Sequence, residues 1–499
     1  MGAAACAHSS ARARPLTLAP RHPRPAARPA RLASGISDSC VRRLACACPS
    51  ARACPLTPRP SSPARPRRPA SQATPDHTPK GRGYQKSLTY LDGANDYWTS
   101  QTGDFCDPAL YVDLYSSDAP AYGQNNSLLC SQTSQQGCAY EDELFVNFTL
   151  GVIAEHDPAT PLFYYLALHN THEPLEAPDA DLARFQFVYD NCTTALPGWD
   201  ASKTNTCSKA VAAPDAYGAA DKGCCFRWYY TTMAHIADKH IGTVVSALQA
   251  KGMWDNTLLL LSSDNGGPIY RNGAAGGNNF PLRGGKKSNF EGGVRVNAFV
   301  SGGLVPAAVR GTTTEALMGS EDWYATFCGL AGIDATDAKA AAAGLPPVEG
   351  YDLWPLLSGA NMTGPRTEVW LGSGGTGDSD NSKQPIIQGL IRADGYKVLW
   401  GDVIENAWTG PFYPNSTTNW CDTCPLSCGT IDAPTCLFNV FSDPTEHDEV
   451  SRANPAIVKD MAKRLKEISA TIFAPDRGDP DTVDACKAGA DGYVRPFLP

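Results

Sequence analysis

Three apolar runs along the chain have the length and composition of buried β-strands. They lie within residues 162–168, 256–267 and 294–303, and none of them alternates regularly between apolar and polar residues. A strand without alternation is typical of a sheet that is covered on both faces. Between residues 226 and 248 apolar residues recur every three or four positions, which predicts an amphipathic helix capped by Gly252. Strands separated by helices predict an α/β fold with a mostly parallel central sheet.

The two ends of the chain have different patterns. Residues 1–80 are rich in Arg, Pro and Ala and follow neither a helical nor a strand period, so we expect a disordered low-complexity segment. Residues 385–402 alternate about an Ala-Asp-Gly turn and predict a hairpin, and residues 455–469 predict a closing helix. We therefore expect a larger domain at 81–375 and a smaller α+β domain at 376–499.

Charge is distributed unevenly along the chain. Residues 1–80 carry 14 Lys and Arg against two acidic residues, whereas residues 81–499 carry 28 basic and 49 acidic residues. Such an acidic body lacks the basic surface that neutralises nucleic-acid phosphates, so nucleic acid is not expected as a partner. No apolar run approaches the roughly 20 residues that a membrane-spanning helix requires, and we expect no membrane span.

Cysteines and glycosylation sequons indicate an oxidising, secretory setting. The chain has 18 cysteines, and five Asn-x-Ser/Thr sequons begin at Asn125, Asn147, Asn191, Asn361 and Asn415. We expect a disulfide-bonded glycoprotein with an extracellular or lysosome-like location, although residues 1–23 lack the continuous apolar segment of a signal peptide. One group of cysteines has a spacing that zinc could use, but the sequons around it favour disulfides: Cys421, Cys424, Cys428 and Cys436.

Two of the predicted strands end in residues that can carry chemistry. In open parallel sheets, ligands bind beyond the carboxyl ends of the strands. One such end carries His169 and His172, and another carries Asp264 and Asn265. The Asp-Asn pair offers hard oxygen donors, which suit Ca²⁺ or Mg²⁺ rather than Zn²⁺. Two donors cannot complete such a site, and Asp-Asn-Gly-Gly taken alone favours an ordinary turn.

The glycine-rich loop that follows brings four cations near this strand end: Arg283, Lys286, Lys287 and Arg295. Cations on such a loop, beside a metal-binding strand end, make a site for a tetrahedral oxyanion. A solvated basic loop is the alternative. Either His169 or His172 could be a general acid or an interior histidine, and their spacing does not choose between them. Glu291 and Asp238 could tune the site or belong to a surface or a helix cap.

Several segments of the chain together resemble the sulfatase family, and most closely its arylsulfatase B-like (N-acetylgalactosamine-4-sulfatase-like) branch. The resemblance rests on "LFYYLALHNTHEPLEAP", "KGMWDNTLLLLSSDNGG", "GGNNFPLRGGKKSNFEGGVR" and "EDWYATFCGLAGID", and it extends from about residue 81 to about 470. It implies an alkaline-phosphatase-like three-layer α/β sandwich with a small C-terminal domain. The activity that it implies is that of an arylsulfatase-type sulfuric ester hydrolase.

The resemblance also assigns roles to individual residues. Asp264 and Asn265 correspond to two ligands of the family's catalytic Ca²⁺, for which Mg²⁺ is a possible substitute. Lys286 falls on the lysine that binds the sulfate and its leaving oxygen. His172, in a His-x-Pro context, matches the active-site histidine and is therefore preferred to His169. The implied mechanism uses a formylglycine, made from a cysteine, whose hydrate attacks sulfur while the lysine and histidine assist the leaving alcohol.

Other parts of the family pattern are missing from this chain. The resemblance implies a first strand ending in paired aspartates, a Cys-x-Pro-Ser-Arg nucleophile motif and a Gly-Lys-Trp-His-Leu-Gly segment, and none of these is present. Cys48, within residues 48–59, takes the register of the nucleophile, but Pro49 stands one place early and Ser50 holds the proline position. Cys48 is thus a weak candidate. We hypothesise that an incorrect gene start or intron boundary accounts for residues 1–80.

Three functions are consistent with this sequence. The leading prediction is a hydrolase of sulfate esters, on a sulfated small molecule or a sulfated glycan. An inactive sulfatase-like protein that binds sulfated glycans is the second, because the nucleophile motif is absent and such catalytic groups act as a unit. A phosphatase or phosphodiesterase of the same superfamily is the third, and the single Asp-Asn pair argues against it.

Overall fold

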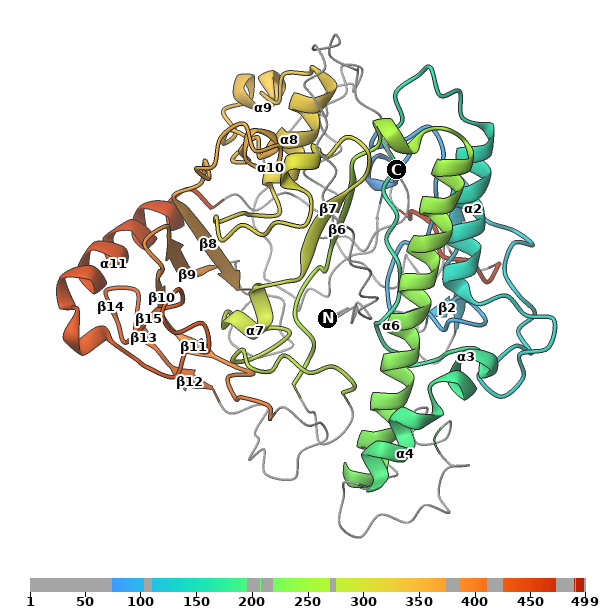
Figure 1. Ribbon diagram of the computed structural model, residues 1–499, viewed down its shortest axis with the longest axis horizontal. Coiled ribbons are helices and arrows are strands. Elements are labelled where there is room, and N and C mark those ends of the chain that lie inside the picture. The colour runs from blue at the N-terminus through green and yellow to red at the C-terminus, as the bar shows by residue number, and fades with distance from the viewer. Residues whose placement is uncertain are drawn as a thin grey trace, which may run out of the picture.

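The computed structural model has a helical part and a sheet part with a short two-stranded ladder between them (Figure 1). The helical part is built on the long helix α6 (Ala219–Ala250), and the sheet part lies next to helix α11 (Pro455–Ser469). The structure describes residues 74–102, 110–194, 207, 219–269, 275–373, 386–410, 425–472, 489 and 491–497.

The helical part confirms the predicted amphipathic helix. Helix α6 packs against α3 (Asp179–Arg184) and α4 (Gln186–Thr194) through a core that contains Met233 and Ile236. It packs against α2 (Glu141–Glu155) through a second core that contains Val244 and Leu248. The helix ends two residues before Gly252, whose φ of 72° is left-handed and is adopted most easily by glycine. Gly252 N donates to Gln249 O, and the next amide returns to Leu248 O, so the last turn is closed as the sequence predicts.

The central ladder consists of β6 (Leu259–Ser262) and β7 (Ala298–Ser301), and its direction differs from the prediction. The two strands run antiparallel, with Leu260 opposite Val300. Every ladder between named strands in the described ranges is antiparallel, so the mostly parallel pairing expected for this region is not observed there. The sequence does not reveal the antiparallel direction of these strands, because apolar periodicity reports burial and not strand direction.

The leucine run is half-buried, where the sequence predicts full burial. Residues 258–261 are of intermediate exposure, and Phe299 on β7 is 49% exposed. Residues 162–168 are mostly of intermediate exposure too and form only an isolated bridge at Leu166. These segments line one continuous cleft, and no further described strand covers them. In the described part of the chain, both segments therefore lie on the cleft wall.

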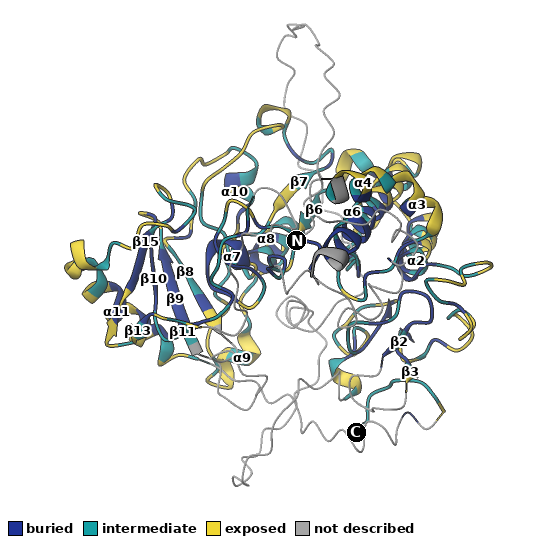
Figure 2. Cartoon of the chain, turned by 90° about the horizontal axis from the view of Figure 1, so that it is seen from below, coloured by how far each residue is buried: buried dark blue, intermediate teal, exposed yellow. Residues whose placement is uncertain are grey.

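The sheet part confirms the predicted hairpin and closing helix. The strands β9 (Ile386–Arg392) and β10 (Tyr396–Leu399) pair antiparallel, with Val398 opposite Leu390. The four-stranded sheet has the order β15-β10-β9-β8, in which β8 spans Glu368–Ser373 and β15 spans Cys436–Asn439. Because β8 begins at Glu368, this sheet includes residues before position 376, at which the sequence predicts the smaller domain to begin. Helix α11 covers one face, and the strands beneath it are buried (Figure 2).

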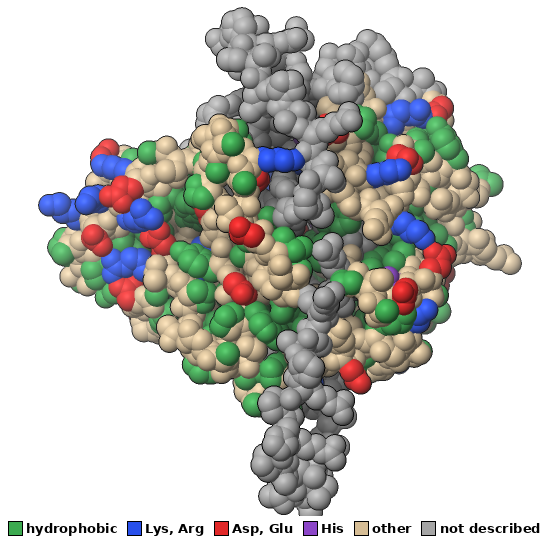
Figure 3. All heavy atoms as spheres, turned by 90° about the horizontal axis from the view of Figure 1, so that it is seen from above, with side chains coloured by type: hydrophobic (Ala, Val, Ile, Leu, Met, Phe, Trp, Pro, Cys, Tyr) green, Lys and Arg blue, Asp and Glu red, His purple; other side chains and the backbone are tan. Residues whose placement is uncertain are grey.

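Charged side chains of both signs are interspersed at the α11 end of the molecule (Figure 3). Arg464 pairs with Glu368 at 2.6 Å, and Lys463 lies 3.8 Å from Glu467. Such exposed pairs contribute little to stability, so α11 is held mainly by its apolar face. Among the described residues no helix is long and apolar enough to cross a membrane.

The remaining elements are short. The strands are β1 (Leu88–Thr89), β2 (Gln101–Thr102), β3 (Tyr111–Val112), β4 (Tyr115–Ser116), β5 (Ala119–Pro120), β11 (Asp402–Val403), β12 (Leu426–Ser427), β13 (Gly429–Thr430) and β14 (Ala433–Pro434). The helices are α7 (Glu291–Val294), α8 (Asp322–Ala331), α9 (Ala338–Ala342) and α10 (Trp354–Leu357), with 3₁₀ turns at Pro75–His77, Trp254–Asn256, Ala307–Val309 and Ser451–Ala453.

Disulfides tie down the helical part and the small hairpins, as the cysteine content predicts. Cys192–Cys224 and Cys207–Cys225 attach neighbouring chain to the start of α6, and Cys130–Cys138 closes a loop. Cys428–Cys436 confirms the preference for a disulfide at that pair. The expectations for Cys421 and Cys424 fall outside the described residues.

Candidate active site

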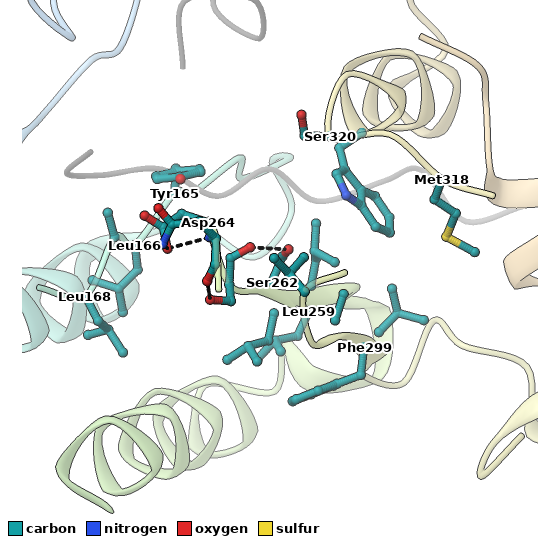
Figure 4. Close-up of a pocket in the computed structure, with 18 of the residues that line it drawn as sticks. Tyr165, Leu166, Leu168, Leu259, Ser262, Asp264, Phe299, Met318 and Ser320 are labelled. Carbon is teal, nitrogen blue, oxygen red and sulfur yellow. Dashed lines mark hydrogen bonds between the residues drawn. The ribbon is translucent and has the colours of Figure 1, made fainter. Parts of the chain in front are cut away.

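The end of β6 presents the Asp-Asn pair at the cleft (Figure 4). Asp264 is exposed and Asn265 is half-buried. Asp264 Oδ1 accepts hydrogen bonds from Asn265 N at 2.8 Å and from Asn265 Nδ2 at 3.0 Å. Ser263 Oγ donates to Asn265 O at 3.0 Å, which fixes the backbone of the same turn. The two candidate metal ligands thus follow the end of β6, where the sequence places them, and local hydrogen bonds fix their turn.

The glycines after this pair permit two backbone segments to touch. A Cβ at Gly266 would lie 1.7 Å from Gly292 O, and one at Gly285 would lie 2.3 Å from Gly267 O. Gly266 N donates to Gly293 O, and Lys286 N donates to Gly267 O at 3.0 Å. The glycines therefore hold the loop that carries Lys286 and Lys287 (the lysine loop), together with α7, against the end of β6, because no larger residue allows this approach.

Lys286 and His172 meet at the cleft although they come from different parts of the chain. Lys286 Nζ lies 2.9 Å from His172 Nε2. His172 Nδ1 lies 2.8 Å from Glu173 O, so the ring donates there and its Nε2 accepts from the lysine. Burial, and then the charge of Lys286, lower the pKa of His172. The pair consequently carries one positive charge near neutral pH.

His169 occupies a different environment and is buried. Its Nδ1 lies 2.8 Å from Glu141 Oε2, and its ring stacks on Tyr97 with centroids 4.0 Å apart. Asp142, at the start of α2, accepts the amides of His169 and Asn170 at 2.8 and 3.1 Å. The amide of His172 then donates to His169 O at 2.9 Å. This geometry makes His169 part of the support for the loop that presents His172.

Three buried carboxyl groups behind this loop have raised pKa values. Burial raises the pKa of Asp113 to about 7, that of Asp142 to about 6 and that of Glu176 to about 8. Hydrogen bonds from backbone amides oppose the shift at each of them. Each group therefore favours its protonated form in the folded state more than it does in the unfolded chain.

Raising the pH from 5 to 8 is expected to lower the free energy of unfolding. The unfolded carboxyls lose their protons near pH 4, whereas Glu176 keeps its proton in the folded state up to about pH 8. Its stabilisation is complete below about pH 4 and is lost as the pH rises through the folded pKa. Glu176→Gln removes this group, so urea unfolding should show the wild type losing about 1 kcal/mol more than the variant per pH unit.

Glu315→Gln is the matched control, because the Glu315 side chain is 81% exposed. Its stability should follow the wild-type pH dependence. If wild type and Glu176→Gln gave parallel curves between pH 5 and 8, Glu176 would not be protonated in the folded state.

The donors at the end of β6 fit a hard cation in kind but not in number. Asp264 and Asn265 supply a carboxylate and an amide oxygen, which are ligands that Ca²⁺ and Mg²⁺ accept. Ca²⁺ takes about six to eight oxygens. Within the described ranges, no group of three or more His, Cys, Asp or Glu could hold a metal ion. The pair is therefore a partial ligand set.

Two charged residues near the lysine loop have structural partners. Arg283 is buried, with its guanidinium carbon 4.1 Å from the ring centre of Phe290 and 4.2 Å from that of Trp408. Glu291 lies 2.9 Å from the buried ammonium of Lys397. Arg283 is thus not one of the cations facing the cleft, because its aromatic partners draw it towards the sheet part.

The sequence did not identify the residue that joins the two loops. Asn279 is buried, its Nδ2 donates to Gly267 O at 2.7 Å and to Gly284 O at 2.9 Å, and its Oδ1 accepts from Gly267 N. Asn279 sits in a polar stretch that is typical of any surface loop, so no local signal marks it. The prediction for Cys48 lies outside the described residues.

The cleft that contains these residues is large. Its volume is about 2960 Å³, and its walls include His172, Asp264, Asn265 and Lys286. A pocket for one small molecule usually measures about 300 to 1000 Å³. The cleft thus has space for a ligand of several sugar units.

Comparison with known proteins assigns a family to this arrangement. The family model described as Sulfatase matches residues 43–333, which is more than half of the chain. This match begins before residue 81 and includes Cys48. Arylsulfatase J of Mus musculus is 27% identical over 417 residues, which cover 79% of this chain and 58% of that protein. Arylsulfatase A of Homo sapiens is 34% identical over 264 residues, covering 50% of this chain and 46% of that protein.

A solved structure supports the same fold. The crystal structure of Ps i-CgsB in complex with k-i-k-neocarrahexaose aligns with a TM-score of 0.52 at 21% identity, over 82% of this chain and 70% of that chain. The fold is therefore α/β and of the alkaline-phosphatase-like type. The chain spans less than two thirds of the length of the two arylsulfatases. On the match of the family model, the chain belongs to the sulfatase family.

Proposed function

We propose that this chain hydrolyses sulfate esters and that the Lys286–His172 pair binds the sulfate group. The observation that carries the proposal is the 2.9 Å contact between Lys286 Nζ and His172 Nε2 at the wall of the cleft. The ring nitrogen that Lys286 contacts belongs to a neutral imidazole, so this contact does not neutralise the ammonium. Membership of the sulfatase family supports the same substrate chemistry.

The pair can serve both binding and proton transfer. Lys286 donates hydrogen bonds to sulfate oxygens, where charge-assisted bonds are strongest. When the bond between sulfur and the ester oxygen breaks, that oxygen leaves as an alkoxide and needs one proton. The Lys286–His172 pair holds one proton between two nitrogens and can deliver it to this oxygen. Glu173 O keeps the imidazole in the tautomer that this transfer requires.

Asp264 and Asn265 are proposed as two of the ligands of a Ca²⁺ ion, with Mg²⁺ as the alternative. When bound, such a cation supplies positive charge to the sulfate oxygens. A formylglycine formed from a cysteine is the nucleophile expected from the family, and Cys48 remains the weak candidate for its precursor. The arylsulfatase B-like branch and its sulfated glycans are likewise a proposal, because the relatives include arylsulfatases J and A.

The disulfides and the exposed sequons support a location in the secretory pathway, outside the cell or in a lysosome-like compartment. Asn147 on α2 and Asn361 are exposed, which leaves their side chains accessible to glycosylation. Four disulfides are formed among the described cysteines, as is usual in an oxidising compartment.

A binding protein for sulfated glycans is the second candidate, because only part of a metal site is described. A hydrolysis assay with a chromogenic aryl sulfate, run beside a binding assay with chondroitin sulfate, separates the two functions. Release of the coloured phenol, lost in Lys286→Met, supports the hydrolase. Binding without turnover supports the second candidate. Turnover of an aryl phosphate in preference to the sulfate would instead favour a phosphatase.

A further inference from the structure

Lys287 adopts a backbone conformation that its residue type disfavours. Its φ is 75°, in the left-handed region that glycine occupies freely and that a residue with a Cβ enters only at a steric cost. The neighbouring turn is closed by Ser288 N, which donates to Gly285 O at 2.9 Å. Strain of this kind persists where the surrounding structure imposes it, and it concentrates at functional sites. A lysine at this position therefore calls for a functional reason.

The charge of Lys287 is not neutralised within the described part of the chain. Its side chain is exposed, and no described acidic group forms an ion pair or hydrogen bond with it. Arg295, on the same stretch, differs in this respect because it pairs with Glu315 at 3.4 Å. Lys287 also follows Lys286 directly, so two like charges stand on adjacent residues. An anionic ligand would relieve this repulsion.

The position of Lys287 connects its charge with the proposed sulfate site. Lys286 and Lys287 both line the cleft, and their Cα atoms are separated by a single peptide unit of about 3.8 Å. Lys286 contacts His172, whereas the side chain of Lys287 is exposed at the cleft. The cleft is larger than one sugar ring requires. Its wall thus offers a second cation beside the first.

We propose that Lys287 binds a second anionic group of the substrate, next to the sulfate ester held by Lys286. This inference rests on the proposed function. The ligand class is a glycan that carries two negative groups on one sugar or on neighbouring sugars. A second sulfate or a uronate carboxylate supplies the same chemistry, and the experiment distinguishes these two sources.

The test compares equilibrium binding of three sulfated ligands at low ionic strength. They are a monosulfated monosaccharide, a disulfated disaccharide and a monosulfated disaccharide with a uronate. Lys287→Gly fits the left-handed backbone, and Lys287→Asn removes the charge while tolerating the same φ. We expect both variants to weaken binding of at least one dianionic ligand at least tenfold more than binding of the monosulfated one. The more affected dianionic ligand identifies the second group as sulfate or carboxylate.

Two further variants complete the design. Lys287→Arg should keep the wild-type preference for the dianionic ligand that Lys287→Gly loses, because arginine keeps the positive charge. Lys463→Asn removes one positive charge from the far surface of α11, where Lys463 is 78% exposed, and should leave the preference unchanged. Equal losses for all three ligands in Lys287→Gly, or no loss, would overturn the inference. Failure of the wild type to bind any sulfated ligand would instead overturn the proposed function.

Discussion

Replacing Gly266 with alanine is expected to destabilise the protein by about 3 kcal/mol or more and to disrupt the candidate site. The new Cβ would lie 1.7 Å from Gly292 O and 2.8 Å from the carbonyl carbon of the same residue. Both atoms belong to the backbone of α7, so relief requires α7 and the lysine loop before it to move away from the end of β6. Overpacking of this kind commonly costs about 1–3 kcal/mol, and a backbone obstacle places this case at the upper end.

Gly242→Ala is the matched control for this prediction. Gly242 lies within α6, and a Cβ there would meet no atom within 4 Å. Alanine should stabilise the helix by roughly 0.5–1 kcal/mol, because glycine loses more conformational freedom in a helix. Urea unfolding followed by circular dichroism measures both changes. A Gly266→Ala protein as stable as the wild type would show that the two loops are not in contact.

Removing the buried ammonium of Lys397 is expected to cost about 3–5 kcal/mol of folding free energy. Lys397 is fully buried, and its Nζ lies 2.9 Å from Glu291 Oε1 and 2.9 Å from Glu446 Oε1. Burial lowers the pKa of Lys397, but the charges of the two glutamates outweigh this and raise it. Lys397→Ala would remove the one buried cation that contacts both carboxylates and leave, among the described ion pairs, only Arg295, 3.9 Å from Glu291, which is the costly way to break a buried ion pair.

Two comparisons isolate the role of the charge. Lys463→Ala removes a lysine from a surface pair whose side chains are 78% and 48% exposed, and it should cost less than about 1 kcal/mol. Combining Lys397→Met with Glu291→Gln and Glu446→Gln removes all three charges and should recover most of the loss. Should the triple variant be no more stable than Lys397→Ala, packing and not charge would explain the effect.

The sequence predicted the elements whose signals are local. The amphipathic period between residues 226 and 248 and the Gly252 cap correspond to α6, and the alternation at 385–402 corresponds to the β9–β10 hairpin. Strand direction was not predictable in the same way. The run beginning at Leu258 has the pattern of a buried parallel strand, but it pairs antiparallel with β7 and faces the cleft. Its pairing partner is distant in sequence, so no local pattern indicates the direction of the pairing.

In the candidate site, too, the residues marked by a local pattern could be predicted and those that depend on distant contacts could not. Asp264 and Asn265 could be found from the residues, since they directly follow an apolar run. His172 and Lys286 are 114 positions apart. The strand ends suggested that their segments meet at one edge of the sheet, and the family resemblance chose His172 over His169 and gave Lys286 its role. Asn279 and the aromatic partners of Arg283 were not foreseen, because each depends on a contact between loops that no local pattern encodes.

The central claim is that Lys286, beside His172, binds the sulfate group of an ester. The most direct test is calorimetric titration of a sulfated monosaccharide and its unsulfated counterpart into the wild type, Lys286→Met and Lys463→Met. A lost charge-assisted contact of about 1.5–3 kcal/mol predicts a loss of affinity for the sulfated sugar of roughly 10- to 150-fold in Lys286→Met alone. Affinity that is equal for both sugars, or unchanged in Lys286→Met, would contradict the account.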